Sequence, residues 1–199
     1  MGDSMKYPTG IKKEFVKPLL HGNRGMQLEN DINTTNEYYL FNEIAVIHKK
    51  PTPITIAKVD YSNSHEAMIR EAYFRTPSTT DYNGIYKGLY IDFEAKETKS
   101  KTMFPLSNIH HHQIKHLSNI IQHGGIGFII IRFTTLNLTY YLDGSKLLEF
   151  IKSDARKSIP LEYCRTCGHL IKDGLNPRTD YLKIVEMLYI KGDKYEEKN

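Results

Sequence analysis

The chain has 199 residues, of which 40% are hydrophobic and 25% are charged, so it fits one ordinary domain with enough apolar material for a core. No stretch approaches the roughly 20 consecutive apolar residues of a membrane-spanning helix, and the N-terminus lacks the layout of a secretory signal. These features argue against an integral membrane protein and predict a cytoplasmic location. The net charge of +4 favours an anionic partner, but it is too small to indicate nucleic acid by itself.

The positive charge is concentrated near the N-terminus. Residues 1–23 combine glycines and prolines with lysines and show little periodicity, which is typical of a flexible arm. Between Lys12 and Arg24, Glu14 is the only acid, and the basic residues are Lys12, Lys13, Lys17, His21 and Arg24. We therefore expect a flexible basic arm over residues 1–23, a folded domain over residues 24–192 and a disordered tail over residues 193–199.

The first half of that domain begins with a helix and continues in short extended segments. Apolar residues at roughly helical spacing predict an amphipathic helix over residues 25–42. A short apolar run at residues 44–47 predicts a buried strand, which the basic residues 48–50 and Pro51 terminate. A second extended strand starts at Pro53, whereas residues 67–74 fit either a short helix or a strand.

The second half alternates strands and helices. Two apolar runs within residues 85–91 flank Lys87 and Gly88, which predicts a tight hairpin because glycine accepts a positive backbone φ angle. A histidine-rich amphipathic segment at residues 106–121 predicts a helix, and the almost wholly apolar residues 127–133 predict a central strand. The remaining expected elements are a strand at 139–142, a short helix at 147–152 and a closing apolar segment at 184–190. This order predicts an α/β fold with a mixed central sheet flanked by helices.

Residues 90–98 carry the pattern with the most chemical information. The two-residue period of a strand places Asp92, Glu94 and Lys96 on one face and apolar residues on the other. A carboxylate can hold a hard divalent cation, and a lysine two residues away can stabilise developing negative charge, as phosphodiester hydrolysis requires. Asp81, on the preceding strand of the hairpin, can supply a second oxygen ligand. The alternative is a solvent-exposed strand face of alternating charge with no chemical role.

The cysteines and histidines offer weaker evidence for a metal site. Cys164 and Cys167 form a lone Cys-x-x-Cys motif, at least one ligand short of a structural zinc site, and we interpret them as reduced thiols in a turn. Three consecutive histidines at residues 110–112 precede His116. On the predicted helix, His112 and His116 lie four residues apart, a spacing that can bring two histidines to one metal ion.

Several longer stretches match one known family in order and spacing. They include Ala-Val-Ile-His-Lys-Lys-Pro-Thr-Pro at residues 45–53 and Ser-Thr-Thr-Asp-Tyr-Asn-Gly at residues 78–84. The full set of matching segments is 23–29, 45–53, 71–74, 78–88, 91–99, 104–106 and 112–114. On these residues the chain resembles the RecU family of Holliday junction resolvases over about residues 23–190, which is far more specific than an isolated Glu-x-Lys pair.

The resemblance implies a restriction-endonuclease-like nuclease fold that acts as a homodimer on four-way junction DNA. A two-fold dimer matches the near two-fold symmetry of such a junction. The resemblance also implies a Mg²⁺ site, with Mn²⁺ as a substitute, and a lysine that stabilises the transition state. The implied metal-site residues are Thr79, Asp81, Glu94 and Gln113, and the implied lysine is Lys96.

Two further acids remain open as metal ligands. By face and spacing Asp92 is as good a candidate as Glu94, although the family pattern favours Glu94. Glu29, on the first helix, could face the site or be an ordinary surface acid. Among the histidine-rich residues, the family pattern assigns the function to Gln113, which argues against a histidine-bound metal.

The resemblance implies DNA-binding parts as well. Residues 50–76 resemble the family's stalk, a protruding extension that enters the open centre of a junction, whereas without the resemblance a solvated hairpin is the simpler interpretation. Arg24, Lys49 and Lys50 are the expected DNA contacts, because lysine and arginine neutralise backbone phosphates.

The leading hypothesis is a magnesium-dependent endonuclease that resolves Holliday junctions by paired nicks during DNA recombination and repair. Two alternatives remain: a catalytically inactive, junction-binding accessory protein, and a nuclease of the same fold with another DNA substrate. The intact set of Asp81, Glu94 and Lys96 favours catalysis over the first alternative. Recombinase or branch-migration proteins are further expected partners, and no membrane partner is expected.

Overall fold

The structure of this protein is a computed structural model that describes residues 27–63, 66–75, 79–153 and 156–191. The predictions for the basic arm, for Arg24 and for the C-terminal tail lie outside these residues. Within them, no helix has both the length and the apolar character needed to cross a membrane.

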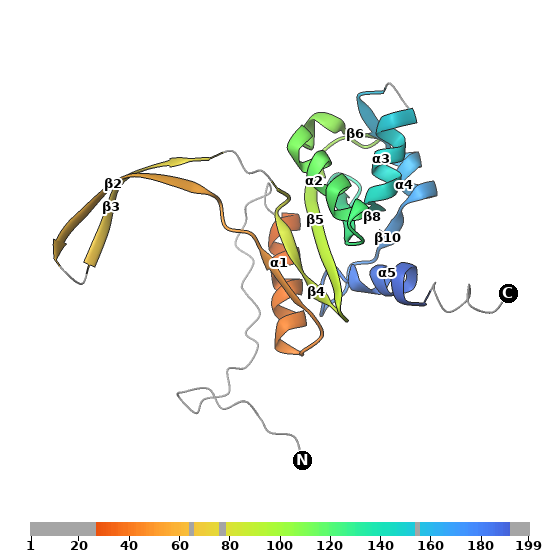
Figure 1. Ribbon diagram of the computed structural model, residues 1–199. Coiled ribbons are helices and arrows are strands. Elements are labelled where there is room, and N and C mark those ends of the chain that lie inside the picture. The colour runs from red at the N-terminus through yellow and green to blue at the C-terminus, as the bar shows by residue number, and fades with distance from the viewer. Residues whose placement is uncertain (1–26, 64–65, 76–78, 154–155, 192–199) are drawn as a thin grey trace, which may run out of the picture.

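A six-stranded sheet forms the centre of the molecule (Figure 1). Its neighbours β5 and β7 run parallel, and its other adjacent pairs are antiparallel. The predicted mixed sheet is therefore confirmed. In spatial order the strands are β1 (Val46–Lys49), β4 (Tyr82–Tyr86), β5 (Leu89–Thr98), β7 (Ile126–Phe133), β8 (Leu138–Asp143) and β10 (His169–Ile171).

Helices pack on both faces of this sheet, as predicted. On one face, α1 and α5 share a hydrophobic core with Phe93 of β5 and Phe128 of β7. On the other face, α2, α3 and α4 share a second core with Ile129 and Ile131 of β7. The helices are α1 (Gln27–Phe41), α2 (His111–Gln122), α3 (Gly144–Ser153), α4 (Leu161–Cys167) and α5 (Leu182–Glu186).

The alternation predicted for residues 90–98 is present in β5. Ile91 and Phe93 are fully buried in the core beneath α1 and α5. Asp92 and Glu94 point to the opposite face, toward α2, and they are fully buried as well. The alternative of a solvent-exposed charged face is therefore wrong, because α2 and the loop before β4 cover these two carboxylates.

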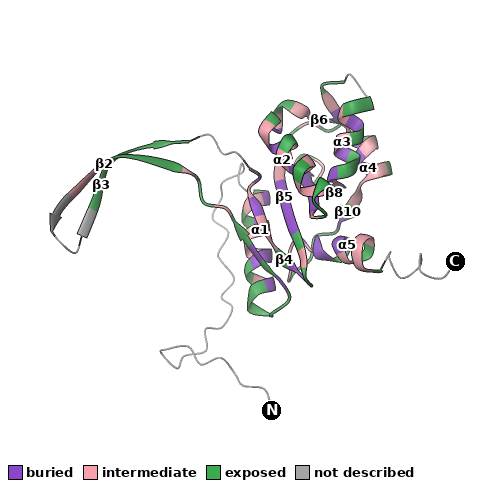
Figure 2. Cartoon of the chain, in the orientation of Figure 1, coloured by how far each residue is buried: buried purple, intermediate pink, exposed green. Residues whose placement is uncertain are grey.

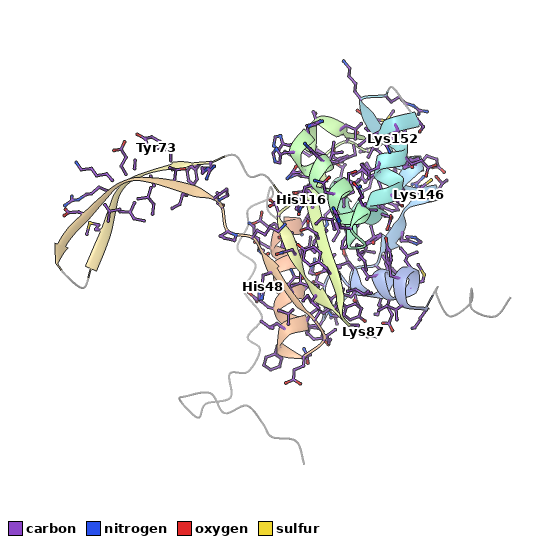
Figure 3. All side chains as sticks on the ribbon, viewed as in Figure 1. His48, Tyr73, Lys87, His116, Lys146 and Lys152 are labelled. Carbon is purple, nitrogen blue, oxygen red and sulfur yellow. The ribbon has the colours of Figure 1, made fainter. Side chains whose placement is uncertain are left out.

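The β2–β3 hairpin, formed by β2 (Ile54–Asn63) and β3 (Glu66–Phe74), extends away from the sheet (Figure 1). The ambiguity over residues 67–74 is thus decided in favour of a strand. The described side chains of this hairpin are exposed or half-buried (Figure 2). Figure 3 shows Tyr73 on the hairpin, far from His116 beside the central sheet.

The predicted turn between β4 and β5 is confirmed, with positive φ angles of 49° at Lys87 and 82° at Gly88. The strand predicted at residues 44–47 begins later, at Val46, because the preceding residues form the turn that ends α1, where Ile44 N donates to Tyr39 O. We expected Asp81 on the first strand of this hairpin, and that prediction is wrong, because Asp81 immediately precedes β4.

The predicted helix over residues 106–121 is shorter than expected. Residues Leu106–Asn108 form a separate 3₁₀ turn, and α2 begins only at His111. The reason is local: a capping box joins His110 and Gln113, so that the helix starts after His110. The closing apolar segment at 184–190 belongs to α5 and to a π-helical turn at Met187–Lys191.

Three elements near the C-terminus were not predicted. They are β9 (Ser158–Pro160), which pairs with β6 (Met103–Pro105), then α4, and the edge strand β10. The cysteine prediction needs a correction, because Cys164 and Cys167 are free thiols within α4 and do not lie in a turn. Cys164 packs in the second hydrophobic core. The three elements were missed because segments this short carry too few residues for a clear periodicity.

Candidate active site

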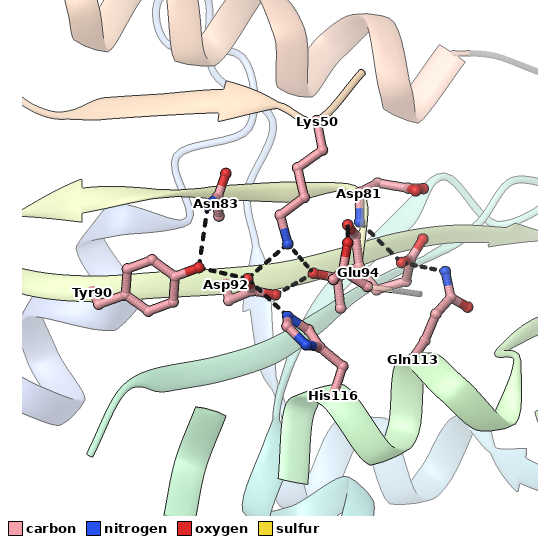
Figure 4. Close-up of polar contacts among 10 residues, drawn as sticks. Lys50, Asp81, Asn83, Tyr90, Asp92, Glu94, Gln113 and His116 are labelled. Atoms are coloured by element: carbon pink, nitrogen blue, oxygen red, sulfur yellow. Dashed lines mark hydrogen bonds and ion pairs between the residues drawn. The ribbon is translucent and has the colours of Figure 1, made fainter. Parts of the chain in front are cut away.

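The candidate active site lies where three segments of the chain meet (Figure 4). β5 supplies Glu94 and Lys96, the loop before β4 supplies Thr79 and Asp81, and α2 supplies Gln113. Four of these five predicted residues are in direct polar contact through Glu94 and Lys96. Thr79 lies two residues from Asp81 and lines the same pocket.

Glu94 is at the centre of this site. Its Oε2 accepts hydrogen bonds from Gln113 Nε2 at 2.6 Å and from the backbone N of Asp81 at 3.2 Å. Its Oε1 lies 2.7 Å from Lys96 Nζ and has no other partner among the described residues. One oxygen of this fully buried carboxylate thus depends on a nearby cation for its stabilisation.

The environment of Glu94 favours the neutral acid when no metal ion is bound. Burial raises the pKa of Glu94 to about 8, and the Asp81 carboxyl adds to the rise, while the positive charge of Lys96 opposes it. A divalent cation beside Glu94 would favour the ionised form. The protonation of Glu94 and the binding of a cation are therefore coupled.

Lys96 connects the buried and the accessible parts of the site. Its Nζ lies 2.7 Å from Glu94 and 3.8 Å from Asp81 Oδ2. The Glu94 side chain is not exposed, whereas those of Lys96 and Asp81 are 24% and 37% exposed. A phosphate group approaching from solvent would therefore meet Lys96 and Asp81, with Glu94 beneath them.

The two neutral residues of the predicted metal site have partners within the chain. Gln113 Oε1 accepts a hydrogen bond from His110 N at 2.9 Å, so the amide nitrogen is the group that faces Glu94. Thr79 Oγ1 donates to the carbonyl of Thr80. In this arrangement both residues would act on a metal ion through water or by orienting a carboxylate, since the Gln113 oxygen is already engaged.

The donor set fits a hard divalent cation such as Mg²⁺. Its groups are oxygens of carboxylate, hydroxyl and amide type, and the buried Glu94 Oε1 lacks a hydrogen bond. No group of three or more histidines, cysteines, aspartates or glutamates suited to a metal ion occurs in the described part of the chain. A cation here would rely on Asp81 and Glu94 together with neutral oxygens and water, which is common for Mg²⁺.

The two acids that the sequence left open have other partners. Glu29 forms an ion pair with Lys49. Asp92 accepts polar contacts from Lys50, Thr80, Tyr90 and His116 and makes none to Glu94 (Figure 4). Sequence reasoning missed these partners of Asp92, and no local pattern could have identified them because most lie on other elements.

The expected DNA contacts that the structure describes lie beside the site. Lys49 and Lys50, at the end of β1, line a pocket of about 230 Å³ together with Pro51, Thr79 and Asp81. Lys49 is exposed, whereas Lys50 is directed inward to Asp92 and Thr80. The pocket joins the base of the β2–β3 hairpin to the candidate active site.

The histidines do not form a metal site among the described residues. His110 and His112 stack with ring centroids 5.3 Å apart, and burial, together with neighbouring positive charge, lowers the pKa of His112. His116 contacts Asp92 through Nε2 at 3.2 Å. Of these histidines, His116 joins α2 to β5 through Asp92.

The chain is similar to known proteins over most of its length. The family described as "RecU: Recombination protein U" matches residues 23–187. The Holliday junction resolvase RecU of Geobacillus sp. (strain WCH70) is 54% identical over 188 residues, covering 92% of this chain and 94% of that protein. The protein of the same name from Geobacillus kaustophilus is 52% identical over 196 residues, covering 94% of this chain and 98% of its own. Archaeoglobus fulgidus Hjc, a Holliday junction resolvase, superimposes with a TM-score of 0.45 at 11% identity, covering 74% of this chain and 96% of that one.

Proposed function

Because this chain belongs to the RecU family, we propose that it is a Holliday junction resolvase, a nuclease that cuts four-way DNA junctions by paired nicks during recombination and repair. The observation that carries this proposal is that Lys96 contacts both the buried Glu94 and the partly exposed Asp81. An accessory protein without catalysis would have no need to keep a buried carboxylate beside a lysine, which is costly to fold.

The residues have distinct roles in this proposal. Asp81 and Glu94 would hold Mg²⁺, or Mn²⁺ in its place, with Thr79 and Gln113 acting through water or by orienting the carboxylates. The bound cation would supply Lewis-acid stabilisation of the phosphate charge and activation of a water molecule. Lys96, fixed by two carboxylates, presents its ammonium group to the phosphate as negative charge develops there.

The surroundings of the site suggest how a junction would be bound. Lys49 and the basic arm with Arg24 would contact phosphates, and the β2–β3 hairpin would act as the stalk that enters the open centre of the junction. A homodimer would present two such sites, one for each of the symmetric cuts. The proposed location is the cytoplasm, where recombinase or branch-migration proteins would be its partners.

The test compares a labelled four-way junction with a linear duplex of the same sequence, in Mg²⁺ and in EDTA. Wild type, Glu94→Gln and the control variant Glu149→Gln are used, because Glu149 is an exposed acid on α3 that pairs with Lys146. We expect paired, Mg²⁺-dependent cuts in the junction alone. Glu94→Gln should bind the junction without cutting it, and Glu149→Gln should behave as wild type.

Two other results would contradict the proposal. Tight junction binding without cleavage under Mg²⁺ or Mn²⁺ would indicate an accessory protein. Equal cleavage of the linear duplex would indicate a nuclease with another DNA substrate.

A further inference from the structure

Asp92 is a second fully buried carboxylate on β5, two residues before Glu94. Its Oδ2 lies 2.8 Å from Lys50 Nζ, 2.9 Å from Tyr90 Oη and 3.2 Å from His116 Nε2. Its Oδ1 accepts a hydrogen bond from Thr80 Oγ1. Asp92 thus accepts contacts from four groups of the protein itself, three of them at Oδ2 and one at Oδ1 (Figure 4).

The donors come from the segments that carry the candidate active site. Thr80 is next to Asp81 in the loop before β4, and His116 lies on the α2 helix that carries Gln113. Lys50 follows β1 at the base of the β2–β3 hairpin, and its Nζ also lies 3.1 Å from Thr80 Oγ1. Asp92 therefore joins three separate segments to the strand that holds Glu94.

This arrangement argues against Asp92 as a metal ligand. A metal ion at Asp92 would have to displace several hydrogen-bond donors from other segments, namely Thr80, Lys50 and His116. Glu94 differs, because its Oε1 has only the partly exposed Lys96 ammonium beside it, at 2.7 Å. The two carboxylates of β5 thus have different surroundings and support different roles.

We propose that Asp92 is a positioning residue, which holds Asp81 and Gln113 in place around Glu94 by binding their neighbours Thr80 and His116. This inference rests on the proposed metal site. Through Lys50 the same carboxylate also fixes the base of the β2–β3 hairpin to the site. Groups that orient metal-binding residues in this way typically change metal affinity by roughly 10- to 100-fold when they are removed.

The test measures Mg²⁺ binding directly, by calorimetry on the full-length protein without DNA, and junction cleavage over a range of Mg²⁺ concentrations. We expect Asp92→Asn to weaken Mg²⁺ binding by roughly 10- to 100-fold, and to raise the Mg²⁺ concentration for half-maximal cleavage by a similar factor. Cleavage should recover at high Mg²⁺ concentration, and junction binding in EDTA should stay unchanged. A residue that serves only the general stability of the sheet would not shift the Mg²⁺ dependence.

Asp31→Asn is the matched control. Asp31 is also a buried carboxylate, 3% exposed, and it pairs with Arg132 and Arg178 beside α1, on the opposite face of β5. Both Asp31→Asn and Asp92→Asn should lower thermal stability, but Asp31→Asn should leave the Mg²⁺ affinity at the wild-type value.

If Asp92→Asn fails to fold, Thr80→Val takes its place, because this change removes one hydrogen-bond donor to Asp92 at nearly constant shape. We then expect a smaller loss of Mg²⁺ affinity.

The outcomes separate this inference from the proposed function. Mg²⁺ affinity of Asp92→Asn equal to that of wild type or of Asp31→Asn would overturn the positioning role, while wild-type cleavage would leave the resolvase proposal intact. If Asp92→Asn loses Mg²⁺ binding and a high Mg²⁺ concentration does not restore it, as we expect for Glu94→Gln, then Asp92 is a metal ligand. That result would also overturn the positioning role. A wild type that binds Mg²⁺ but cuts no junction would refute the proposed function alone.

Discussion

The central sheet and the β2–β3 hairpin differ in how far their side chains are buried. In the sheet, Phe93, Asp92 and Glu94 of one strand are all fully buried, between α1 and α5 on one face and α2 on the other. In the hairpin, Met68 is 61% exposed and Phe74 is 84% exposed. A two-stranded hairpin of this kind has little stability of its own in water, and large exposed apolar side chains commonly mark a binding surface.

This difference indicates that the proposed cleavage and the proposed junction recognition belong to different regions of the molecule. Cleavage needs groups held at fixed distances, and a covered strand of a six-stranded sheet provides that rigidity. Recognition of a junction needs a protruding surface, which the hairpin provides. The two regions meet at Lys50, which lies at the base of the hairpin and contacts Asp92 of the sheet.

The largest expected effect is on stability, and it should distinguish the two regions directly. Phe93→Ala removes a fully buried ring from the core and should lower the free energy of unfolding by about 3–5 kcal/mol. Phe74→Ala, in the hairpin, should change it by no more than about 0.5 kcal/mol. Urea denaturation of both variants measures these values. A large loss for Phe74→Ala would mean that the hairpin is packed against another surface in solution.

The next effect concerns catalysis within the sheet. Lys96→Met keeps the length of the side chain but removes the charge that faces the phosphate, so junction cleavage should fall by about 10²–10³-fold. The control Lys146→Met removes an exposed lysine on α3 and should have no effect. Single-turnover cleavage rates measure the change, and a loss below about threefold would exclude a role for Lys96 in the transition state.

A deletion of the hairpin tests whether the regions are separable. Arg75 N donates to Pro53 O at 2.9 Å, so residues 54–74 can be replaced by a short Gly-Ser linker without moving the sheet. We expect the thermal transition to persist and junction binding to weaken by about 10-fold or more, because phosphate contacts and the junction-entering element are lost. Gel-shift titration against junction and duplex measures the selectivity. Unchanged preference for the junction would remove the hairpin from recognition.

The most gradual expected effect is the pH dependence of stability in EDTA. The pKa of Glu94 is about 8 in the folded chain against an ordinary value of 4.5, so the native state binds the proton more tightly than the unfolded state. The resulting stabilisation is complete below about pH 4.5 and is lost as the pH rises toward 8, by at most about 1.4 kcal/mol per pH unit.

Glu94→Gln should lack this contribution to the pH dependence. Urea denaturation of both proteins between pH 5 and pH 8, taken in steps of roughly one unit, measures the difference. Mg²⁺ should offset the loss in wild type at the upper end of this range, because the ion binds the ionised carboxylate. Parallel curves for wild type and Glu94→Gln would show that Glu94 is ionised throughout.

Local patterns were sufficient to predict much of the sheet. The alternation in β5 and the positive φ angle at Gly88 depend on neighbouring residues only, so the sequence predicted both correctly. The short elements β9, α4 and β10 were missed because segments of three to seven residues are defined by the partners on which they pack. Thr79 and Gln113 were predicted as site residues only from the family resemblance.

By itself, the sequence determined that β5 carries Asp92, Glu94 and Lys96 on one face, because a strand has a fixed two-residue period. Only the tertiary structure decided that Asp92 and Glu94 have different environments. Lys50 and His116 reach Asp92 from 42 and 24 residues away, whereas Gln113 reaches Glu94 from 19. The role of a buried carboxylate depends on which donors surround it, and contacts between distant segments are set by packing, which no local pattern records.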